Sequence, residues 1–463
     1  MRLFLVLEIN THNSLLVKKF IKTLKNIWSI DELRSKIIVT LALIFVYRFG
    51  THIVLPGMDP NLLDAAQANA SQNGILGLFD MFAGGAFSQA SILALGIMPY
   101  ISASIFMQLM TILVPQLQKV QKEGDSGRKK INQWTRYLTV IVTIFQASAY
   151  VAYLNGPGYA EAIIPAYKSY FALSTIVMLT AGTLFVMWLG EKIQDKGLGN
   201  GTSIIIMVGI LARFPQALIQ EFGAKQAKGG GGLLIFLVEI AIFIAIIMGI
   251  IILVQGVRKI PVNYAKQIVG NRQFGGARQF LPMKVNMAGV MPIIFAQAIM
   301  FLPTLFSFTN TESGRGIAKV FGDHSNFWYM LVYSIMVIAF TFLYTALIFN
   351  PKQMGEDLKR NNGFIPGVKP GQPTSEYIGA IMDKITLPGA IFLALVGILP
   401  GFAQRLGVTA QFSTFFGGTS LLIMVGVILD TLQQIETQLL MRQYDGLMNS
   451  GRIQGRQVPS ASI

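Results

Sequence analysis

Residues that could perform chemistry are scarce in this chain of 463 residues. It has no Cys, and its three histidines, His12, His52 and His324, are scattered without the spacing of metal ligands. The GxxxxGK[ST] phosphate loop, the HExxH zinc motif and the GxSxG nucleophile elbow do not occur in it. We therefore expect no catalytic residue, no metal site and no cofactor, so that energy for work on a substrate comes from elsewhere.

Ionisable residues inside apolar stretches are equally sparse. Glu239, Asp430 and Glu436 lie within candidate membrane spans, and Arg48 and Arg213 lie near the ends of two others. A carrier of small solutes usually places ionisable groups near helix centres, where they bind the substrate or relay protons. The scarcity of such groups argues against that class.

Branched aliphatic side chains suggest a different kind of site. Ile97 and Ile101 are one helical turn apart and share a helix face, and Pro99 between them is expected to loosen the helix. A ring of such side chains at the waist of a channel can block ions by dewetting while it remains deformable. Isoleucine at this spacing more often marks ordinary packing, so both interpretations stay open from spacing alone.

The segment before these isoleucines, residues 75–87, is too short to cross a bilayer. It contains Asp80 and ends near Gly84 and Gly85, which predicts a short amphipathic helix with a flexible joint before a span at 88–114. A half-helix at membrane depth is tolerated only where it faces protein or a water-filled cavity. The segment is therefore either a re-entrant surface loop or a movable plug.

The elements that must position these residues are membrane helices. The chain is 53% hydrophobic and 13% charged, far too apolar for a soluble domain of this size. Hydropathy predicts an all-α, polytopic membrane protein with ten spans. The predicted spans are residues 34–54, 88–114, 134–154, 169–190, 201–219, 233–255, 287–308, 327–349, 386–404 and 415–440.

Positive charge predicts the orientation of the spans. The formal net charge is +15, and 29 of the 37 Lys and Arg residues fall on the side that holds both termini. This bias places both termini in the cytoplasm, as an even number of spans allows. Because five is odd, the halves 34–219 and 220–441 run through the membrane in opposite senses, as in many transporters. No internal sequence repeat accompanies this symmetry.

Four further segments lie on the predicted internal side. Residues 1–33 form a basic, amphipathic arm without a cleavage site, expected on the inner membrane surface, and residues 442–463 form a tail. The loops 256–286 and 350–385 are too long for mere connections and combine positive charge with Gly and Pro turns. They suit acidic lipid headgroups, ribosomal RNA phosphates or an acidic protein partner.

Six long blocks of the sequence carry a specific resemblance. They are MFAGGAFSQASILALGIMPYISASI (81–105), KEGDSGRKKINQWTRY (122–137), MWLGEKIQDKGLGNGTSIII (187–206), RKIPVNYAKQ (258–267), LPMKVNMAGVMPIIFA (281–296) and FGGTSLLI (416–423). Together they resemble the SecY family, the central subunit of the bacterial protein-conducting channel, over about residues 30–450.

The resemblance implies a clam-like fold of two five-helix halves with a lateral gate that opens toward lipid. The gate is framed by the helices at 88–114 and 134–154 on one side and by those at 287–308 and 327–349 on the other. The segment 75–87 matches the family's re-entrant plug helix. Its candidate plug residues are Ile75, Leu78, Phe79, Met81, Phe82, Gly84 and Gly85.

The family's aliphatic pore ring carries over onto six positions by the same resemblance. These are Ile97, Ile101, Thr202, Ile206, Ile294 and Ile423. Thr202 departs from the aliphatic residue that the family more often has, so its hydroxyl makes that side of the constriction less apolar.

The loops 256–286 and 350–385 match the family's cytosolic protrusions, which meet the ribosome and the translocation ATPase. The basic residues expected to dock these partners are Arg258, Lys259, Arg272, Arg278, Lys359, Arg360 and Lys369. Lys369 stands where the family often has Arg, and Lys cannot reproduce bidentate Arg contacts. The implied partners are a SecE-like single-span clamp subunit, a SecG-like small subunit, a SecA-type motor ATPase, the ribosome, signal sequences, secretory polypeptides and membrane lipid.

The expected function is a passive channel in the bacterial plasma membrane, with no enzymatic activity. It passes unfolded polypeptide and releases signal and transmembrane segments into lipid. Two alternatives remain at this point. A secondary transporter requires polar groups that converge at mid-membrane, whereas an insertase or lipid-handling protein without a pore needs neither a moving plug nor an aliphatic ring.

Overall fold

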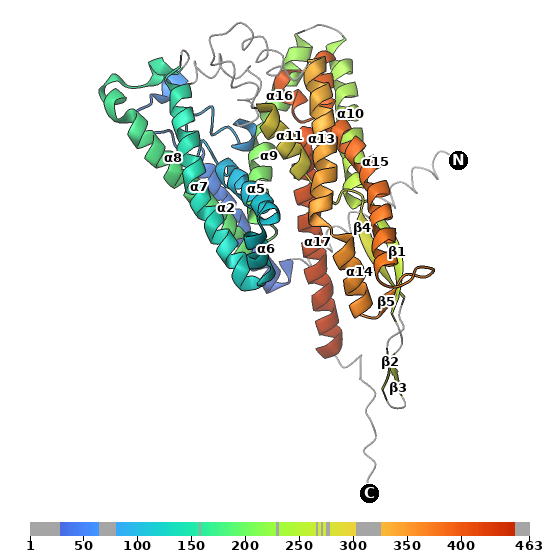
Figure 1. Cartoon of the computed structure of the whole chain (residues 1–463). Helices are drawn as coiled ribbons and strands as arrows, with labels where there is room; N and C mark the ends of the chain where they lie inside the picture. The colour runs from blue at the N-terminus through green and yellow to red at the C-terminus, as the bar shows by residue number, and fades with distance from the viewer. Residues whose placement is uncertain are drawn as a thin grey trace.

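The computed structural model describes residues 28–63, 80–156, 159–227, 231–264, 267–269, 272–274, 278–301 and 326–449. Two groups of long helices lie side by side in it (Figure 1). The first group comprises α2 (Asp31–Gly50), α5 (Met98–Leu113), α6 (Pro115–Lys122), α7 (Asp125–Leu154), α8 (Lys168–Lys196) and α9 (Gly201–Gln226), with short 3-10 turns η1 (Ala160–Ala162) and η2 (Pro165–Tyr167). The second comprises α10 (Gly232–Gln255), α11 (Met291–Phe301), α13 (Phe327–Ile348), α14 (Pro351–Arg360), α15 (Gln372–Arg405), α16 (Ala410–Ser413) and α17 (Gly418–Asn449).

Seven helices among the described residues are long and apolar enough to cross a membrane, or eight if the bent pair α5 and α6 counts as one span. Six of the seven contain the predicted spans at 134–154, 169–190, 201–219, 233–255, 327–349 and 386–404, and the seventh contains the span at 415–440 except for its first three residues. The predicted span at 34–54 corresponds to α2, which has 20 residues. Only the first part of the predicted span at 287–308 is described, as α11. The helical, polytopic fold class is confirmed.

The predicted span at 88–114 was wrong in its first ten residues. Residues 88–97 form a series of turns, and the helix α5 starts only at Met98. Pro99 therefore lies in the first helical turn, where a missing N–H is harmless, and does not loosen the helix as expected. After Val114 the chain bends by 103° into α6.

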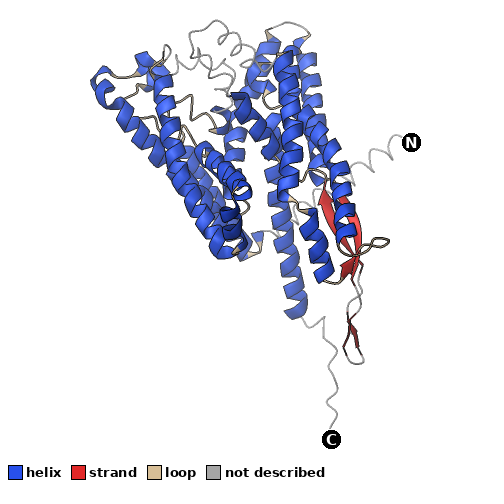
Figure 2. Ribbon diagram, in the orientation of Figure 1, coloured by secondary structure: helices blue, strands red, loops and turns tan. Residues whose placement is uncertain are grey.

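The two long internal loops, which combine charge with Gly and Pro turns, contain short strands and helices. The strands are β1 (Val257–Tyr264), β2 (Gln267–Val269), β3 (Arg272–Phe274), β4 (Arg278–Lys284) and β5 (Gly363–Phe364). β4, β1 and β5 form an antiparallel sheet at one end of the second helix group, and β2 pairs with β3 beyond it (Figure 2). Within the predicted connection 350–385, α14 and the start of α15 are helical.

Apolar side chains form one large core that extends through both helix groups. It includes Tyr47 of α2, Ile210 of α9, Phe243 of α10 and Val337 of α13. Because α9 packs against α8 on one side and α17 on the other, this core joins the two halves. A smaller core lies within the first group, and a third anchors the sheet to α15.

Candidate functional site: constriction and plug

The six predicted ring positions all lie at or near the first two turns of helices. Ile97 is the residue before α5, and its carbonyl accepts the Ile101 N–H at 3.1 Å, so the two remain one turn apart as predicted. Thr202 and Ile206 lie at the start of α9. Ile294 and Ile423 lie at the starts of α11 and α17.

Three of these positions are buried in the same apolar core. They are Ile97, Ile206 and Ile423, and Ile101 packs at the margin of that core. Thr202 and Ile294 are half-buried. The structure therefore brings residues from α5, α9 and α17 into one cluster across the two helix groups, and the role of the six as a pore ring stays a prediction.

A glycine contact brings the start of α9 close to Ile97. A Cβ added at Gly201 would lie 1.9 Å from the carbonyl oxygen of Gly190 on α8, so the two backbones touch there. A Cβ at Gly190 would lie 3.6 Å from Ile97 Cδ1 and 3.5 Å from the Thr202 nitrogen. The close approach of α8 and α9 thus positions Thr202 near Ile97.

The described part of the plug starts at Asp80. Met81 and Phe82 are buried, whereas Ile75, Leu78 and Phe79 lie outside the described residues. Gly84 and Gly85, predicted as a flexible joint, have φ angles of +65° and +94° and are buried. These two glycines therefore allow a tight turn within packed protein.

Aromatic side chains of the first helix group contact the end of this turn. The Tyr150 hydroxyl donates a hydrogen bond to the carbonyl of Phe87 at 2.6 Å, and their rings meet edge to face at 4.7 Å. Tyr153 and Tyr159 extend the cluster, with ring centroids 5.2 Å apart. Burial raises the pKa of the Tyr159 hydroxyl, in the loop after α7, above its ordinary value.

The helices predicted to frame a lateral gate pack as two pairs, α5 with α7 and α11 with α13. Within the described part of the chain, a hydrogen bond crosses between the pairs, from the Tyr344 hydroxyl of α13 to Gln108 Oε1 of α5 at 3.1 Å. On the α13 side, the rings of Phe295 and Phe340 stack with centroids 5.7 Å apart. The sequence contained no signal for the bond between Tyr344 and Gln108.

The two internal loops, which carry the predicted docking residues, share one sheet. β5, from the second loop, pairs with β1, from the first, so Asn263 faces Phe364 in the register. Ile260 and Ile365 are buried beneath the sheet against α15. Arg258, Lys259, Lys359, Arg360 and Lys369 are exposed, and Arg272 and Arg278 lie in β3 and β4, with side chains outside the described part.

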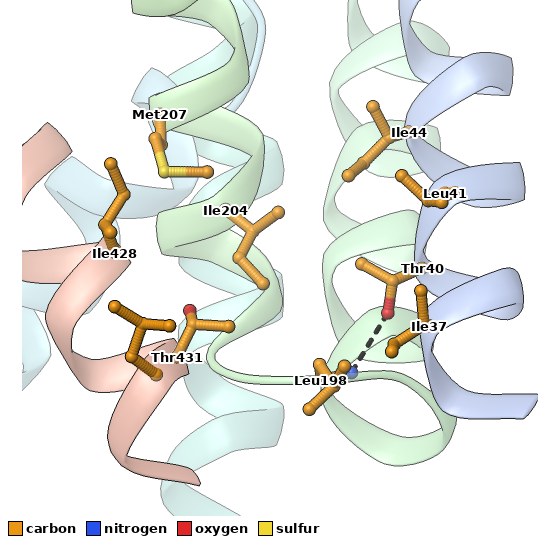
Figure 3. A pocket seen from close by; sticks show the side chains of 10 residues that line it. Ile37, Thr40, Leu41, Ile44, Leu198, Ile204, Met207, Ile428 and Thr431 are labelled. Atoms are coloured by element: carbon orange, nitrogen blue, oxygen red, sulfur yellow. Dashed lines mark hydrogen bonds between the residues drawn. The ribbon is translucent and has the colours of Figure 1, made fainter. Parts of the chain in front are cut away.

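An apolar groove of about 250 Å³ lies where α2, α9 and α17 meet, so both helix groups contribute to it (Figure 3). The Thr40 side chain accepts the backbone N–H of Leu198 at 3.0 Å at one end of this groove. Gln434 of α17 accepts the neighbouring Gly199 N–H at 2.9 Å. The groove is lined by Ile37, Thr40, Leu41, Ile44, Leu198, Ile204, Met207, Ile428, Thr431 and Leu432.

Two buried or partly buried charge clusters escaped the sequence reasoning. The first joins Asp80 of the plug to Arg213 of α9. The second joins Glu221 and Lys225 of α9 to Glu239 of α10. The four-residue spacing of Glu221 and Lys225 was a usable signal, since it places both side chains on one helix face.

These features define a multi-pass, α-helical membrane protein whose halves meet around an aliphatic cluster and a packed plug segment. The family model SecY matches residues 91–432. The chain is 42% identical to the protein translocase subunit SecY of Streptomyces galbus over 90% of this chain and 97% of that one. It is 40% identical to the subunit of that name from Chlamydia muridarum over 94% and 99% of the two chains. The chain therefore belongs to the SecY family.

Solved structures support the fold. In one solved SecY structure, the plug domain stabilises the closed state of the translocation channel and maintains a membrane seal. That structure aligns with this chain with a TM-score of 0.60 at 18% identity. Sec61 from the canine ribosome–channel complex aligns with a TM-score of 0.53 at 15% identity. Each alignment covers 90% of this chain and 94% of the other.

Proposed function

We propose that this protein is the channel subunit of a Sec-type protein translocase. It passes unfolded secretory polypeptides across the bacterial plasma membrane and releases signal and transmembrane segments laterally into lipid. Membership of the SecY family is the observation that carries this proposal. The aliphatic cluster at the starts of α5, α9 and α17 supports it, since weak apolar contacts suit a substrate of arbitrary sequence.

Opening follows from competition at the lateral gate. A signal sequence is an apolar helix, and it binds between the α5–α7 pair and the α11–α13 pair in place of their mutual contacts. Because it binds the parted arrangement better than the closed one, it shifts the population toward the open state. The hydrogen bond from Tyr344 to Gln108 is one contact that this shift must break.

The groove between α2, α9 and α17 is where we place the SecE-like clamp subunit. A single apolar helix there would contact Ile37 of the first helix group and Ile428 of the second, and so hold the halves together while the gate opens. A SecG-like small subunit completes the membrane complex.

Both termini and the sheet-bearing loops lie in the cytoplasm, as the distribution of positive charge favours. The chain itself has no enzymatic role in this proposal. The ribosome, through its RNA phosphates, and a SecA-type motor ATPase dock on the exposed basic residues of the two loops and supply the energy.

Site-specific photo-crosslinking tests the channel. A photoreactive residue is placed singly at Ile97, at Ile294 and, as a lipid-facing control, at Leu237, which is 67% exposed. A secretory precursor is stalled partway through export. We expect adducts from Ile97 and Ile294 but not from Leu237. Adducts at none of the three, with the precursor verified as membrane-inserted, would refute the pore and favour an insertase.

A further inference from the structure

The turn from Asp80 to Ser88 is held by charged and polar contacts to α9. The Asp80 carboxylate is paired with the Arg213 guanidinium. The same Arg213 nitrogen donates to the Ser88 hydroxyl at 2.8 Å, and the Ser88 backbone N–H donates to Asp80 Oδ1 at 2.7 Å. One arginine of α9 therefore closes a ring of contacts around both ends of the turn.

A second arginine, from α2, binds the middle of the turn. Arg48 Nη1 donates to the carbonyl oxygen of Gly84 at 3.0 Å. A Cβ added at Gly84 would lie 2.6 Å from this nitrogen, and one at Gly85 would lie 2.9 Å from Arg213 Nε. The two glycines thus permit a close approach of the backbone to both guanidinium groups.

The turn also touches the backbone of α9 directly. Gly209 lies on α9 one turn before Arg213. A Cβ added at Gly209 would lie 2.7 Å from the carbonyl oxygen of Phe82. This fit against α9 places Asp80 within reach of Arg213.

The cluster of two arginines and one aspartate carries its smallest net charge while the turn is in place. The side chains of Arg213 and Asp80 are 24% and 17% exposed, so water screens their attraction less than at an open surface. Arg48 and Arg213 are close enough to repel each other electrostatically. Removing the turn takes away Asp80 and leaves two like charges together.

We propose that Arg48 and Arg213 are positioning residues that hold the plug in its seated position, and that the ion pair between Asp80 and Arg213 sets how readily it leaves. The inference rests on the proposed channel function, which it deepens by naming the contacts that keep the resting channel closed. Displacing the plug breaks the ion pair and the Gly84 hydrogen bond, and it removes the one anion that lies near the two arginines.

The experiment measures plug position and leak separately in the membrane complex. The chain has no Cys, so Ala86→Cys, at a fully buried position, introduces its only thiol. The labelling rate of this thiol by a membrane-impermeant maleimide reports how often the plug leaves its seat. Ion conductance of the same complexes in planar bilayers, without precursor, reports the leak.

We expect Asp80→Asn and Arg213→Gln each to speed labelling roughly tenfold or more, since charged hydrogen bonds are lost. The double variant should add little to either single change, because the two side chains act through each other. Lys168→Gln, which removes an exposed cation of α8, is the matched control and should leave labelling unchanged.

The possible outcomes distinguish a failure of the proposed plug contacts from a failure of the proposed channel function. We call the hold of Arg48 and Arg213 on the plug the latch. Faster labelling in both single variants, with raised conductance, supports both the latch and the channel function. Faster labelling without any conductance supports the latch and counts against the pore. Labelling that stays at the rate of the Lys168→Gln control in both variants overturns the latch, whatever the conductance. Additive effects in the double variant would overturn the direct coupling of Asp80 to Arg213.

Discussion

Three ionisable side chains, Glu221, Lys225 and Glu239, lie together where the end of α9 meets α10. Lys225 Nζ lies 2.6 Å from Glu239 Oε1 and 3.3 Å from Glu221 Oε1, and it donates to the Gly407 carbonyl at 3.1 Å. Glu221 in turn accepts the backbone N–H of Thr409 at 2.8 Å. All three ionised residues are buried. Lys225 therefore supplies one positive charge between two carboxyl groups held away from water, and it ties α9 to α10 and to the turn before α16.

Replacing Lys225 with Met should lower the free energy of unfolding by roughly 3–5 kcal/mol, because it leaves buried carboxylates without a counter-charge. The measurement is denaturant unfolding of the purified protein in detergent micelles. Lys168→Met, at an exposed lysine, should shift the midpoint little. Equal shifts for the two variants would show that the cluster contributes nothing specific to stability.

At the scale of residues, spacing along the chain predicted the ring and plug positions only with the help of the family resemblance. Glu239 looked like a lone acid within a span, and Asp80 like a polar residue of an amphipathic segment. Their partners, Lys225 and Arg213, are brought to them by a turn between two helices and by the packing of the plug on α9. Such pairs depend on tertiary structure, so periodicity cannot identify them.

At the scale of elements, apolar length predicted where helices occur better than where they start. The run from Ser88 is apolar enough for a span, yet its backbone is bound by other partners. The Leu55 N–H donates to Ala90 at 2.8 Å, and the Ile92 N–H donates to Ile53 at 2.9 Å. These hydrogen bonds replace the helical pattern, and α5 starts only after them. Hydropathy carries no information about such contacts.

The pair of elements α5 and α13 yields a prediction about the gate. Tyr344→Phe removes the hydroxyl that reaches Gln108 and keeps the ring that packs against Phe295 at 6.2 Å. Loss of one such bond costs about 1 kcal/mol, which should raise the open-to-closed ratio roughly fivefold. Spin labels on α7 and α13 would measure the distance distribution across the gate.

The control for this variant is Tyr170→Phe, at a tyrosine that is 76% exposed on α8. It should leave the distance distribution unchanged. If Tyr344→Phe also leaves it unchanged, the hydrogen bond does not hold the gate, and other contacts between the two helix pairs must do so.

At the scale of the whole molecule, charge predicted which loops share one side of the membrane, and hydropathy predicted two halves with five helices each. They did not predict that the two long loops share one sheet. Within β1, the buried Ile260 and Val262 lie on either side of the less buried Pro261, a period of two that is a signal for a strand. The addition of β5 from about a hundred residues further on depends on α14 and α15, whose first turns had looked like loop.

This shared sheet leads to a prediction about docking. Arg258 and Lys259 are adjacent on β1 and both exposed, so their cations stand on opposite faces of one rigid strand. Changing both to Gln should weaken ribosome binding and reduce the slope of log K against log salt by up to about 0.7 for each lost RNA phosphate contact. The measurement is titration of ribosomes onto the complex in lipid nanodiscs at several salt concentrations.

The matched control removes the same charge from the predicted external side, by Lys168→Gln with Arg405→Gln, where both residues are exposed. Long-range attraction by net charge would weaken equally in both doubles, whereas phosphate contacts change the salt slope only for the β1 double. An unchanged slope for the β1 double would refute RNA contact by this strand. Reduced motor binding with unchanged ribosome binding would assign this surface to an acidic protein, because the sheet would then recognise carboxylates rather than phosphates.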